Sequence, residues 1–451
     1  MNILLVNPSW GATVHRQRYN RRWPPLDLLN VAAKLRGDGF GISLLDARAS
    51  GRGPEEASRE AERAGLVVVS TSPLDRWQCP NIDLQPLLPW TRITSPDRLI
   101  LYGAHGTVFP EEILEMTGAR AVVRGEPEEA VPLLCRMLER GRESWEDVPS
   151  VSFRKEGRVH HNPPGKPVDL AAMPLPAYDL VRPDDYEYEL LGERLAVLET
   201  SRGCPHRCSY CMKEMYGPGV RFKPVAQVGA ELERVIARGF RHVYFIDLEF
   251  SVSRRRVLEL CRMLRAMPLR WCCQTRVDAV DPELLREMAA AGCRLIHYGI
   301  ESGAESMRQD IRKGIDANRI EEAVRWTKDC GIATAGFFLF GFPGESASMR
   351  KATEDLARRL NLTYASFHSV TPYPGTLLGR LTGKVRPWWE SAGEPGKPGE
   401  DLRRVYLRYY LRPAYWMEFL RRGACRFAAV RLFAQFLGSD SPPPRSTGRR
   451  P

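Results

Sequence analysis

The sequence predicts an α/β protein in which two parallel-sheet units follow one another and a helical region comes last. With 451 residues, the chain exceeds the ~250–300 residues that one hydrophobic core usually supports. Short apolar runs alternate with helical patterns before residue 140 and again after residue 193, which is typical of βαβ units. Between them, residues 141–192 are rich in proline and charge and weakly periodic, so we expect a linker or strap there.

Residues 1–140 predict a doubly wound parallel sheet, whose ligand should lie beyond the carboxyl ends of its strands. Helical patterns at 26–36 and 55–64 separate the first strands. The first apolar run lacks the basic segment and cleavage site of a signal peptide, so we expect it to be a strand. The expected strands are Ile3–Val6, Ile42–Leu45, Leu66–Ser70, Leu99–Tyr102 and Ala121–Val123.

Residues 193–385 predict six further β/α units, which suit a partial TIM-like (β/α)6 barrel better than a closed eightfold one. The expected strands are Leu195–Thr200, His242–Asp247, Trp271–Arg276, Leu295–Ile300, Ala335–Phe340 and Ala365–Val370. The expected helices are Val225–Arg238, Arg254–Met267, Pro282–Ala291, Asn318–Cys330 and Ser346–Arg359.

Residues 386–437 predict a helical C-terminal extension. It begins with a loop at 386–400 and continues as helix over 402–437, where aromatic residues and leucine alternate with arginine. Such a helix either packs on the barrel with its arginines in water or contacts an anionic membrane or an acidic substrate. Residues 438–451, rich in serine, proline and arginine, are expected to be disordered.

Charge and cysteine content restrict the class of protein. The net charge is +11, but residues 403–450 alone hold eleven arginines against two acidic residues. The remainder is therefore nearly neutral, which argues against a nucleic-acid-binding face. Eleven cysteines favour a reducing compartment, so we expect a cytoplasmic protein. No apolar run reaches the 18 residues of a membrane-spanning helix.

The segment SRGCPHRCSYC at residues 201–211 carries the sharpest chemical signal. Cys204, Cys208 and Cys211 form a C-x3-C-x2-C pattern directly after a predicted strand. Three thiolates on one loop can hold a 4Fe–4S cluster and leave one iron without a protein ligand, open to a substrate or cofactor. The alternatives are chance and a structural zinc site, for which His206 would have to serve as the fourth ligand.

This motif, with its surroundings over residues 193–385, resembles the radical S-adenosylmethionine (SAM) superfamily. The resemblance implies that the open iron chelates the amino and carboxylate groups of SAM. Reductive cleavage then yields a 5′-deoxyadenosyl radical, with the electron supplied by an external flavodoxin or ferredoxin. Tyr210 matches the aromatic residue that the family places near the SAM adenine.

The resemblance also implies further SAM-binding residues at successive strand ends, where a barrel presents its active site. Asp247 and Glu249 stand where the family binds the SAM amino group, although Leu248 departs from the usual polar pattern. Glu301 matches a position near the ribose or the methionyl end. The remaining SAM candidates are Gln274, Arg276, Gly341 and Gly344.

Residues 1–140 resemble the cobalamin-binding domain of the cobalamin-dependent radical SAM class. The matching pieces lie at strand ends, and the candidate cobalamin-binding residues are Ser72, Gly103, His105, Thr107, Gly125 and Glu126. The Asp-x-His-x-x-Gly element that supplies a histidine to cobalt elsewhere is absent after the first strand. His105 is therefore either a cobalt ligand or a packing group, and a domain that has lost its cofactor is the alternative for the whole unit.

These resemblances imply a methyltransferase that acts on a small-molecule biosynthetic intermediate with a 4Fe–4S cluster, SAM and methylcobalamin. The alternative is a radical cyclase, oxidase or rearrangement enzyme of the anaerobic magnesium-protoporphyrin cyclase type. An RNA methylthiotransferase would need a second three-cysteine cluster, yet residues 1–140 hold only Cys79 and Cys135. A non-catalytic iron–sulfur scaffold would not need an open iron.

Overall fold

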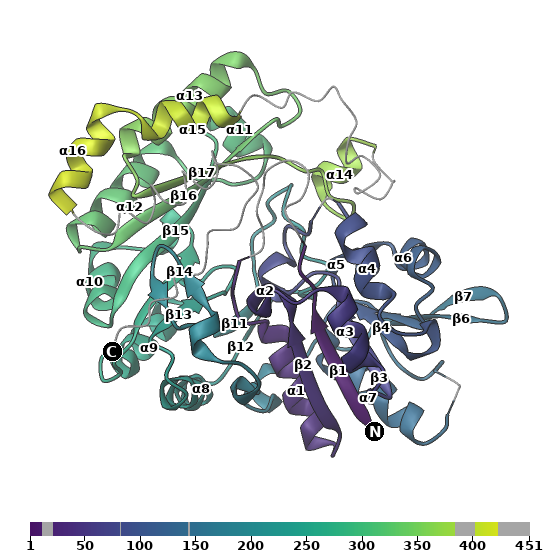
Figure 1. Cartoon of the computed structure of the whole chain (residues 1–451). Coiled ribbons are helices and arrows are strands. Elements are labelled where there is room, and N and C mark those ends of the chain that lie inside the picture. The colour runs from purple at the N-terminus through teal and green to yellow at the C-terminus, as the bar shows by residue number, and fades with distance from the viewer. Residues whose placement is uncertain (11–20, 82, 143–144, 384–401, 423–451) are drawn as a thin grey trace.

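The computed structural model describes residues 1–10, 21–81, 83–142, 145–383 and 402–422. It confirms the predicted α/β fold with a doubly wound N-terminal sheet and a partial six-stranded barrel (Figure 1). The two sheets lie side by side, with helices on the outer side of the barrel sheet (Figure 1). A hydrophobic cluster with members from both units runs through the molecule.

The N-terminal sheet has the strand order β2-β1-β3-β4-β5-β6-β7. Neighbours from β2 to β5 are parallel, and the order reverses at β1, so that the switch point lies between β1 and β3. The parallel strands are β1 (Asn2–Asn7), β2 (Gly41–Asp46), β3 (Leu66–Ser70), β4 (Leu99–Tyr102) and β5 (Ala121–Val123). The helices are α1 (Leu26–Gly37), α2 (Ala47–Ser50), α3 (Pro54–Ala61), α4 (Leu88–Thr91), α5 (Ala104–Val108), α6 (Pro110–Thr117) and α7 (Pro127–Glu139).

An antiparallel hairpin extends this sheet, which the sequence did not predict. Strands β6 (Val151–Lys155) and β7 (Arg158–His161) belong to the segment expected to be a linker. Glu156 and Gly157 both have positive φ and form the two-residue turn between them. Three of the four residues of strand β7 are polar and exposed, so it lacks the apolar alternation that marks a strand in a sequence.

The barrel sheet has six parallel strands in the order β10-β13-β14-β15-β16-β17. These are β10 (Leu195–Leu198), β13 (His242–Phe245), β14 (Arg270–Thr275), β15 (Cys293–Glu301), β16 (Ala333–Phe340) and β17 (Tyr364–Ser369). The connecting helices are α8 (Val225–Ala237), α9 (Arg254–Leu264), α10 (Pro282–Ala290), α11 (Glu305–Asp310), α12 (Ala317–Asp329), α13 (Ala347–Leu360) and α14 (Leu377–Leu381). Two small hairpins, β8 (Glu187–Tyr188) with β9 (Gly192–Glu193) and β11 (Ser201–Gly203) with β12 (Val220–Phe222), complete the strands.

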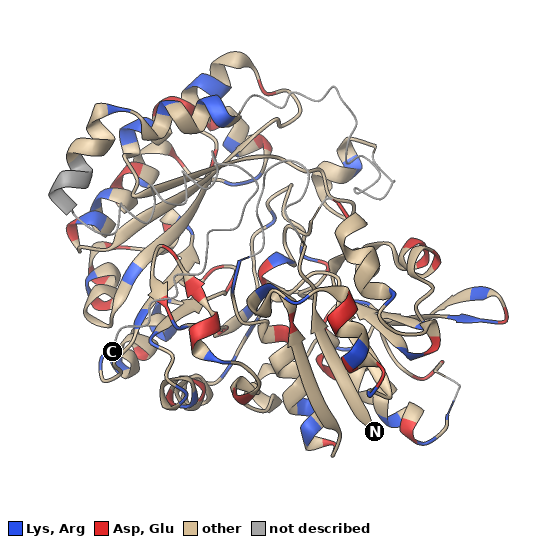
Figure 2. Cartoon of the chain, viewed as in Figure 1, with Lys and Arg blue, Asp and Glu red and all other residues tan. Residues whose placement is uncertain are grey.

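Basic and acidic residues are interspersed on the helices of both units (Figure 2). Among the described residues, no helix combines the length and the hydropathy needed to cross a bilayer.

The described part of the C-terminal region packs on the last barrel strand. It forms two helices, α15 (Leu402–Tyr410) and α16 (Pro413–Arg422), because Pro413 begins a new helix. Helix α15 packs beside α13 and against β17 (Figure 1). Residues 423–437, expected to continue the helix, lie outside the described residues.

Tyrosine hydroxyls from these helices bind the backbone of the edge strand β17. Tyr406 accepts a hydrogen bond from the N–H of Phe367 at 3.0 Å. The Tyr410 hydroxyl accepts from the N–H of Ala365 and donates to its carbonyl, both at 3.0 Å. An edge strand presents unpaired backbone groups, and these hydroxyls pair with some of them. The tyrosines of α15 thus pair with backbone groups at the edge of the barrel sheet.

We expect Tyr410→Phe to lower the free energy of unfolding by about 1–3 kcal/mol, because it leaves the buried N–H of Ala365 without a partner. Chemical denaturation followed by circular dichroism measures this loss. Trp416→Phe, at a side chain that is 38% exposed on α16, is the control. Equal stability of the two variants would show that the hydroxyl does not support the barrel edge.

Candidate active site

The three motif cysteines lie on a loop of residues 204–219, the cysteine loop, which connects the paired strands β11 and β12. The backbone N–H of Ser209 donates to the carbonyl of Ile311 at 3.0 Å, and its carbonyl accepts from the N–H of Leu378 at 2.8 Å. Lys213 donates from Nζ to the carbonyls of Cys204 and His206. Contacts from two sides therefore fix the loop's shape.

The three thiols are free and half-buried on this loop. Burial raises the pKa of the Cys204 thiol, and burial together with the neighbouring thiols raises that of Cys211 to about 12. Thiolates at such positions need a cationic partner, which an iron–sulfur cluster supplies. The donor set therefore fits a cluster held by three cysteines.

His206 binds Glu249, the carboxylate whose Oε2 also lies 3.9 Å from the Cys204 sulfur. Its Nε2 lies 2.8 Å from Oε2 of Glu249. Within the described ranges, no three histidine, cysteine or acidic side chains gather closely enough to hold a single metal ion. A structural zinc would need four such ligands around one point.

Gly203, directly before Cys204, holds a conformation that requires glycine. Its φ is +95°, and a Cβ atom would lie 2.1 Å from the carbonyl oxygen of Gly219. We expect Gly203→Ala to separate β11 from β12 and to reduce the iron bound after reconstitution by more than half. Gly219→Ala is the matched control, since its φ is +73° with nothing near the Cβ position; it should lose only ~1–2 kcal/mol of stability. Equal iron content in both variants would contradict the expected role of the close backbone contact.

Several predicted SAM-binding residues gather on the rim beside the cysteine loop. Glu301, at a positive φ of 69°, lies with its Oε1 3.2 Å from Nζ of Lys313. Arg276 donates to the Lys313 carbonyl at 2.9 Å. Glu249 lies with its Oε2 3.9 Å from the Cys204 sulfur, and burial raises the pKa of this carboxyl to about 7. The rim thus combines carboxylates with cations, which suits a zwitterionic ligand.

The other predicted SAM-binding residues differ in their surroundings. The Tyr210 ring packs edge-on against Phe342, 5.8 Å between centroids. Gly341 donates its N–H to the Glu345 carboxylate, and Gly341 and Gly344 both have positive φ. Gln274 is half-buried, 3.4 Å from the Tyr244 hydroxyl.

Asp247 is buried and binds residues just before the cysteine loop. It accepts three hydrogen bonds, from the N–H and hydroxyl of Thr200 and from the hydroxyl of Ser201. The buried carboxylate therefore holds the residues that precede the cysteine loop, and its role toward SAM stays a prediction.

Two rim cations were missed by the sequence analysis. Lys213 and Lys313 lie against the cysteine loop and Glu301, respectively. Lys213 follows the third cysteine by two residues and could have been noticed for that reason. Lys313 lies in an irregular segment after α11, so no periodic pattern marks it.

The predicted cobalamin-binding residues lie at the carboxyl edge of the N-terminal sheet, next to the cysteine loop. The Ser72 hydroxyl accepts from the N–H of Ala104 at 2.6 Å. A Cβ atom on Gly103 would lie 2.5 Å from the Thr71 hydroxyl. Thr107 accepts from the N–H of Gly125 at 2.8 Å and donates to the Met215 sulfur of the cysteine loop at 3.0 Å. The two units therefore meet at this edge.

His105 and Glu126 have other contacts than a ligand-binding role would require. His105 is fully buried, stacks on Trp10 at 5.9 Å and lies with its Nε2 2.8 Å from the Asn81 carbonyl. Burial lowers its pKa to about 4. These contacts favour the packing interpretation of His105 over cobalt ligation. Glu126 accepts from the N–H of Val168 and pairs with Arg202 and Arg221.

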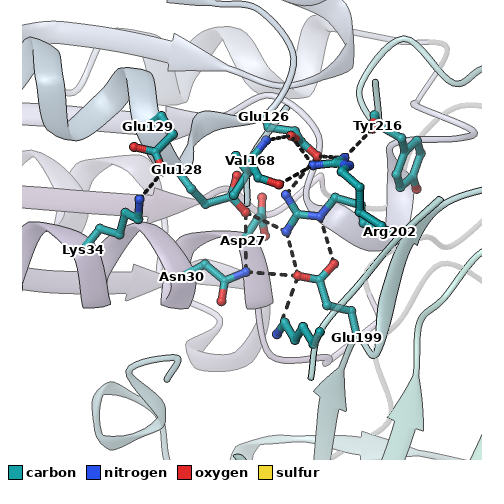
Figure 3. A network of polar contacts seen from close by, with 12 residues as sticks. Asp27, Asn30, Lys34, Glu126, Glu128, Glu129, Val168, Glu199, Arg202 and Tyr216 are labelled. Atoms are coloured by element: carbon teal, nitrogen blue, oxygen red, sulfur yellow. Dashed lines mark hydrogen bonds and ion pairs between the residues drawn. The ribbon is translucent and has the colours of Figure 1, made fainter. Parts of the chain in front are cut away.

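Arg202 is the centre of a buried ionic network that joins the two units (Figure 3). Its fully buried guanidinium lies 2.7 Å from Glu128, 3.2 Å from Glu126 and 2.6 Å from Glu199. Glu126 and Glu128 stand at the start of α7 in the N-terminal unit, whereas Glu199 follows β10. Because Arg202 is two residues from Cys204, the network fixes the cysteine loop to the N-terminal unit. The sequence analysis did not identify it.

Comparison with known proteins gives a consistent assignment. Residues 198–357 match the radical SAM superfamily. An uncharacterized methyltransferase of Pyrococcus horikoshii is 28% identical over 441 residues, which cover 92% of this chain and 93% of the relative. The anaerobic magnesium-protoporphyrin IX monomethyl ester cyclase of Rubrivivax gelatinosus is 25% identical, with 92% of this chain and 78% of the relative covered.

A solved structure shares most of this fold. The radical SAM methyltransferase TsrM from Kitasatospora setae, solved with cobalamin and a 4Fe–4S cluster bound, superposes with a TM-score of 0.69 at 22% identity. The superposition covers 85% of this chain and 76% of TsrM. At this identity the likeness concerns the fold: an N-terminal α/β unit followed by a partial barrel.

Proposed function

We propose that this chain, a radical SAM enzyme that uses a 4Fe–4S cluster and SAM, also binds cobalamin and transfers methyl groups to a small molecule. The observation that carries the proposal is the meeting of the cysteine loop with the carboxyl edge of the N-terminal sheet. Thr107 contacts Met215 there, and Tyr373 donates to the Pro80 carbonyl at 2.8 Å. A ligand at the switch point of the N-terminal sheet would thus lie close to the cysteine loop.

The residues at this edge fit a large polar ligand. The Thr71 hydroxyl, Nε and Nη2 of Arg48 and Oδ2 of Asp75 are buried and have no hydrogen-bond partner among the described residues. Buried polar groups normally find partners, and the amide-bearing periphery of a corrin ring would offer them. Gly103 allows the loop after β4 to pack closely on Thr71 and Ser72, which a Cβ atom would meet.

The chain's own residues would bind the cluster, SAM and cobalamin, orient them and shield them from solvent. The three thiols would hold the cluster, and Lys213 fixes the backbone of their loop. Glu301, Lys313 and Arg276 present both charges to the amino and carboxylate groups of SAM. When bound, the cluster supplies the electron for SAM cleavage and cobalamin carries the methyl group. The buried Arg202 network joins the two units next to the cysteine loop.

The similarity of chain architecture supports methyl transfer, since the Pyrococcus relative, described as a methyltransferase, aligns over nearly its whole length. A second candidate is a radical cyclisation or oxidation, supported by the Rubrivivax cyclase, which aligns over 92% of this chain. In either case the electron would come from a flavodoxin or ferredoxin, and the protein would act in the cytoplasm.

Anaerobic reconstitution with iron, sulfide and hydroxocobalamin tests the proposal. We expect the purified protein to retain about one cobalamin per chain. With SAM that carries a deuterated methyl group and a reductant, mass spectrometry should find labelled methylcobalamin. Cleavage of SAM without any labelled methylcobalamin would favour the cyclase-type reaction, and loss of cobalamin on gel filtration would refute the cobalamin proposal.

A further inference from the structure

A cluster of aromatic and imidazole side chains lies inside the barrel, next to the residues assigned to SAM. We call Tyr188, Tyr244, His297 and Phe337 the lumen cluster. His297 of β15 stacks on Phe337 of β16 at 5.6 Å and 19° and on Tyr188 at 5.9 Å and 24°. Tyr244 of β13 meets His297 edge-on at 5.7 Å. Three barrel strands and β8, which carries Tyr188, thus contribute rings to one cluster.

The lumen cluster lies directly below the rim. Alternate residues of a strand face the same side: Gln274 precedes Arg276 by two positions, and the Tyr244 hydroxyl lies 3.4 Å from the Gln274 amide oxygen. Phe337 and, on β17, His368 are half-buried, so part of each ring remains accessible. A molecule bound there would reach the rim residues that surround the cysteine loop.

Arg21 brings a positive charge to this surface from the N-terminal unit. Its guanidinium lies 4.7 Å from the centroid of Trp23, and Trp23 packs on Tyr244 at 4.7 Å. The charge acts on Tyr188 and Tyr244. It also contributes, after burial, to the lowered pKa values of His297 and His368.

Arg21 is exposed and forms no ion pair within 4.0 Å among the described residues, and Asp75 is the acidic residue whose charge raises its pKa. Its neighbour Arg22, in contrast, pairs with Glu187. An accessible guanidinium with two parallel donor pairs matches a carboxylate or phosphate. The accessible parts of the Phe337 and His368 rings suit a planar apolar body. Both features point to the same kind of ligand.

We propose, on the premise that the chain is the small-molecule enzyme described above, that the barrel interior binds a substrate with a planar apolar body and an anionic group held by Arg21. The anionic group is a carboxylate or a phosphate. The accessible part of the Phe337 ring contacts the planar body, and the rim residues face its opposite end, where the chemistry takes place.

Isothermal titration of the reconstituted holoprotein tests this proposal with three small probes: phenyl phosphate, benzoate and the neutral benzamide. We expect at least one anionic probe to bind and benzamide to bind at least ten times more weakly. Arg21→Gln should weaken the anionic probe about 10- to 100-fold, the range for a lost charge-assisted hydrogen bond. Arg21→Lys should lose less, and the control Arg22→Gln should bind as the wild type does.

The comparison of phenyl phosphate with benzoate distinguishes a phosphate from a carboxylate substrate. Equal binding of benzamide and the anions, or unchanged binding in Arg21→Gln, would overturn the proposal. These titrations need no turnover, so their failure is separate from that of the proposed function, which cobalamin retention and methyl labelling decide.

Discussion

Cys208→Ala is expected to abolish the visible absorbance of the reconstituted cluster and to reduce SAM cleavage to the background of the assay. The cluster depends on three thiols from one loop, and a variant with two has too few ligands to retain it. Iron and sulfide analysis, with about four of each per wild-type chain expected, measures the loss. Cys204→Ala and Cys211→Ala should behave in the same way.

Cys330→Ala is the matched control for this series. Cys330 is also a free, half-buried cysteine, but it follows α12 on the outside of the barrel. The Cys330→Ala variant should retain full iron content and full SAM cleavage. A cluster that survives in Cys208→Ala, or one that is lost equally in Cys330→Ala, would contradict the assignment of the ligands.

Arg202→Met should lower the free energy of unfolding by about 3–5 kcal/mol, the loss measured when one partner of a buried ion pair is removed. The substitution would leave Glu126, Glu128 and Glu199 buried together without their central cation. Lys223 lies 3.8 Å from Glu199 and compensates only part of this charge. Denaturant unfolding of the apoprotein under reducing conditions gives the difference.

Arg255→Met is the control, because Arg255 forms a surface pair with Glu259 and its side chain is 91% exposed. It should change the stability by less than about 1 kcal/mol. Arg202→Lys keeps the charge but not the fork of donors, so an intermediate loss is expected. If Arg202→Met were as stable as Arg255→Met, the network would not join the two units as described.

The fold was predictable from the sequence wherever strands are buried on both faces. Strands β3 and β4 match the predicted ranges because every residue in them is apolar or small and buried. The hairpin β6–β7 was missed because β7 is an exposed edge strand. The C-terminal region was recognised as helical, but its role at the barrel edge depends on tyrosine hydroxyls, which no periodic pattern reveals.

The sequence indicated which loops and strand ends form the site. It did not indicate in which direction every side chain there points. The cysteine motif is local, so its spacing alone indicates its chemistry. Arg202 contacts Glu128 across 74 positions of the chain, and such a pairing leaves no local signal. Glu126 was placed at the correct sheet edge, but its carboxylate binds arginines. Which way a strand-end side chain turns is decided by packing.

Electron paramagnetic resonance of the reduced, reconstituted protein tests the central claim most directly. With three protein ligands, one iron of the cluster remains available, so addition of SAM should change the g-values of the reduced 4Fe–4S signal. A signal that SAM leaves unchanged, or a protein that takes up one zinc ion in place of the cluster, would contradict the account.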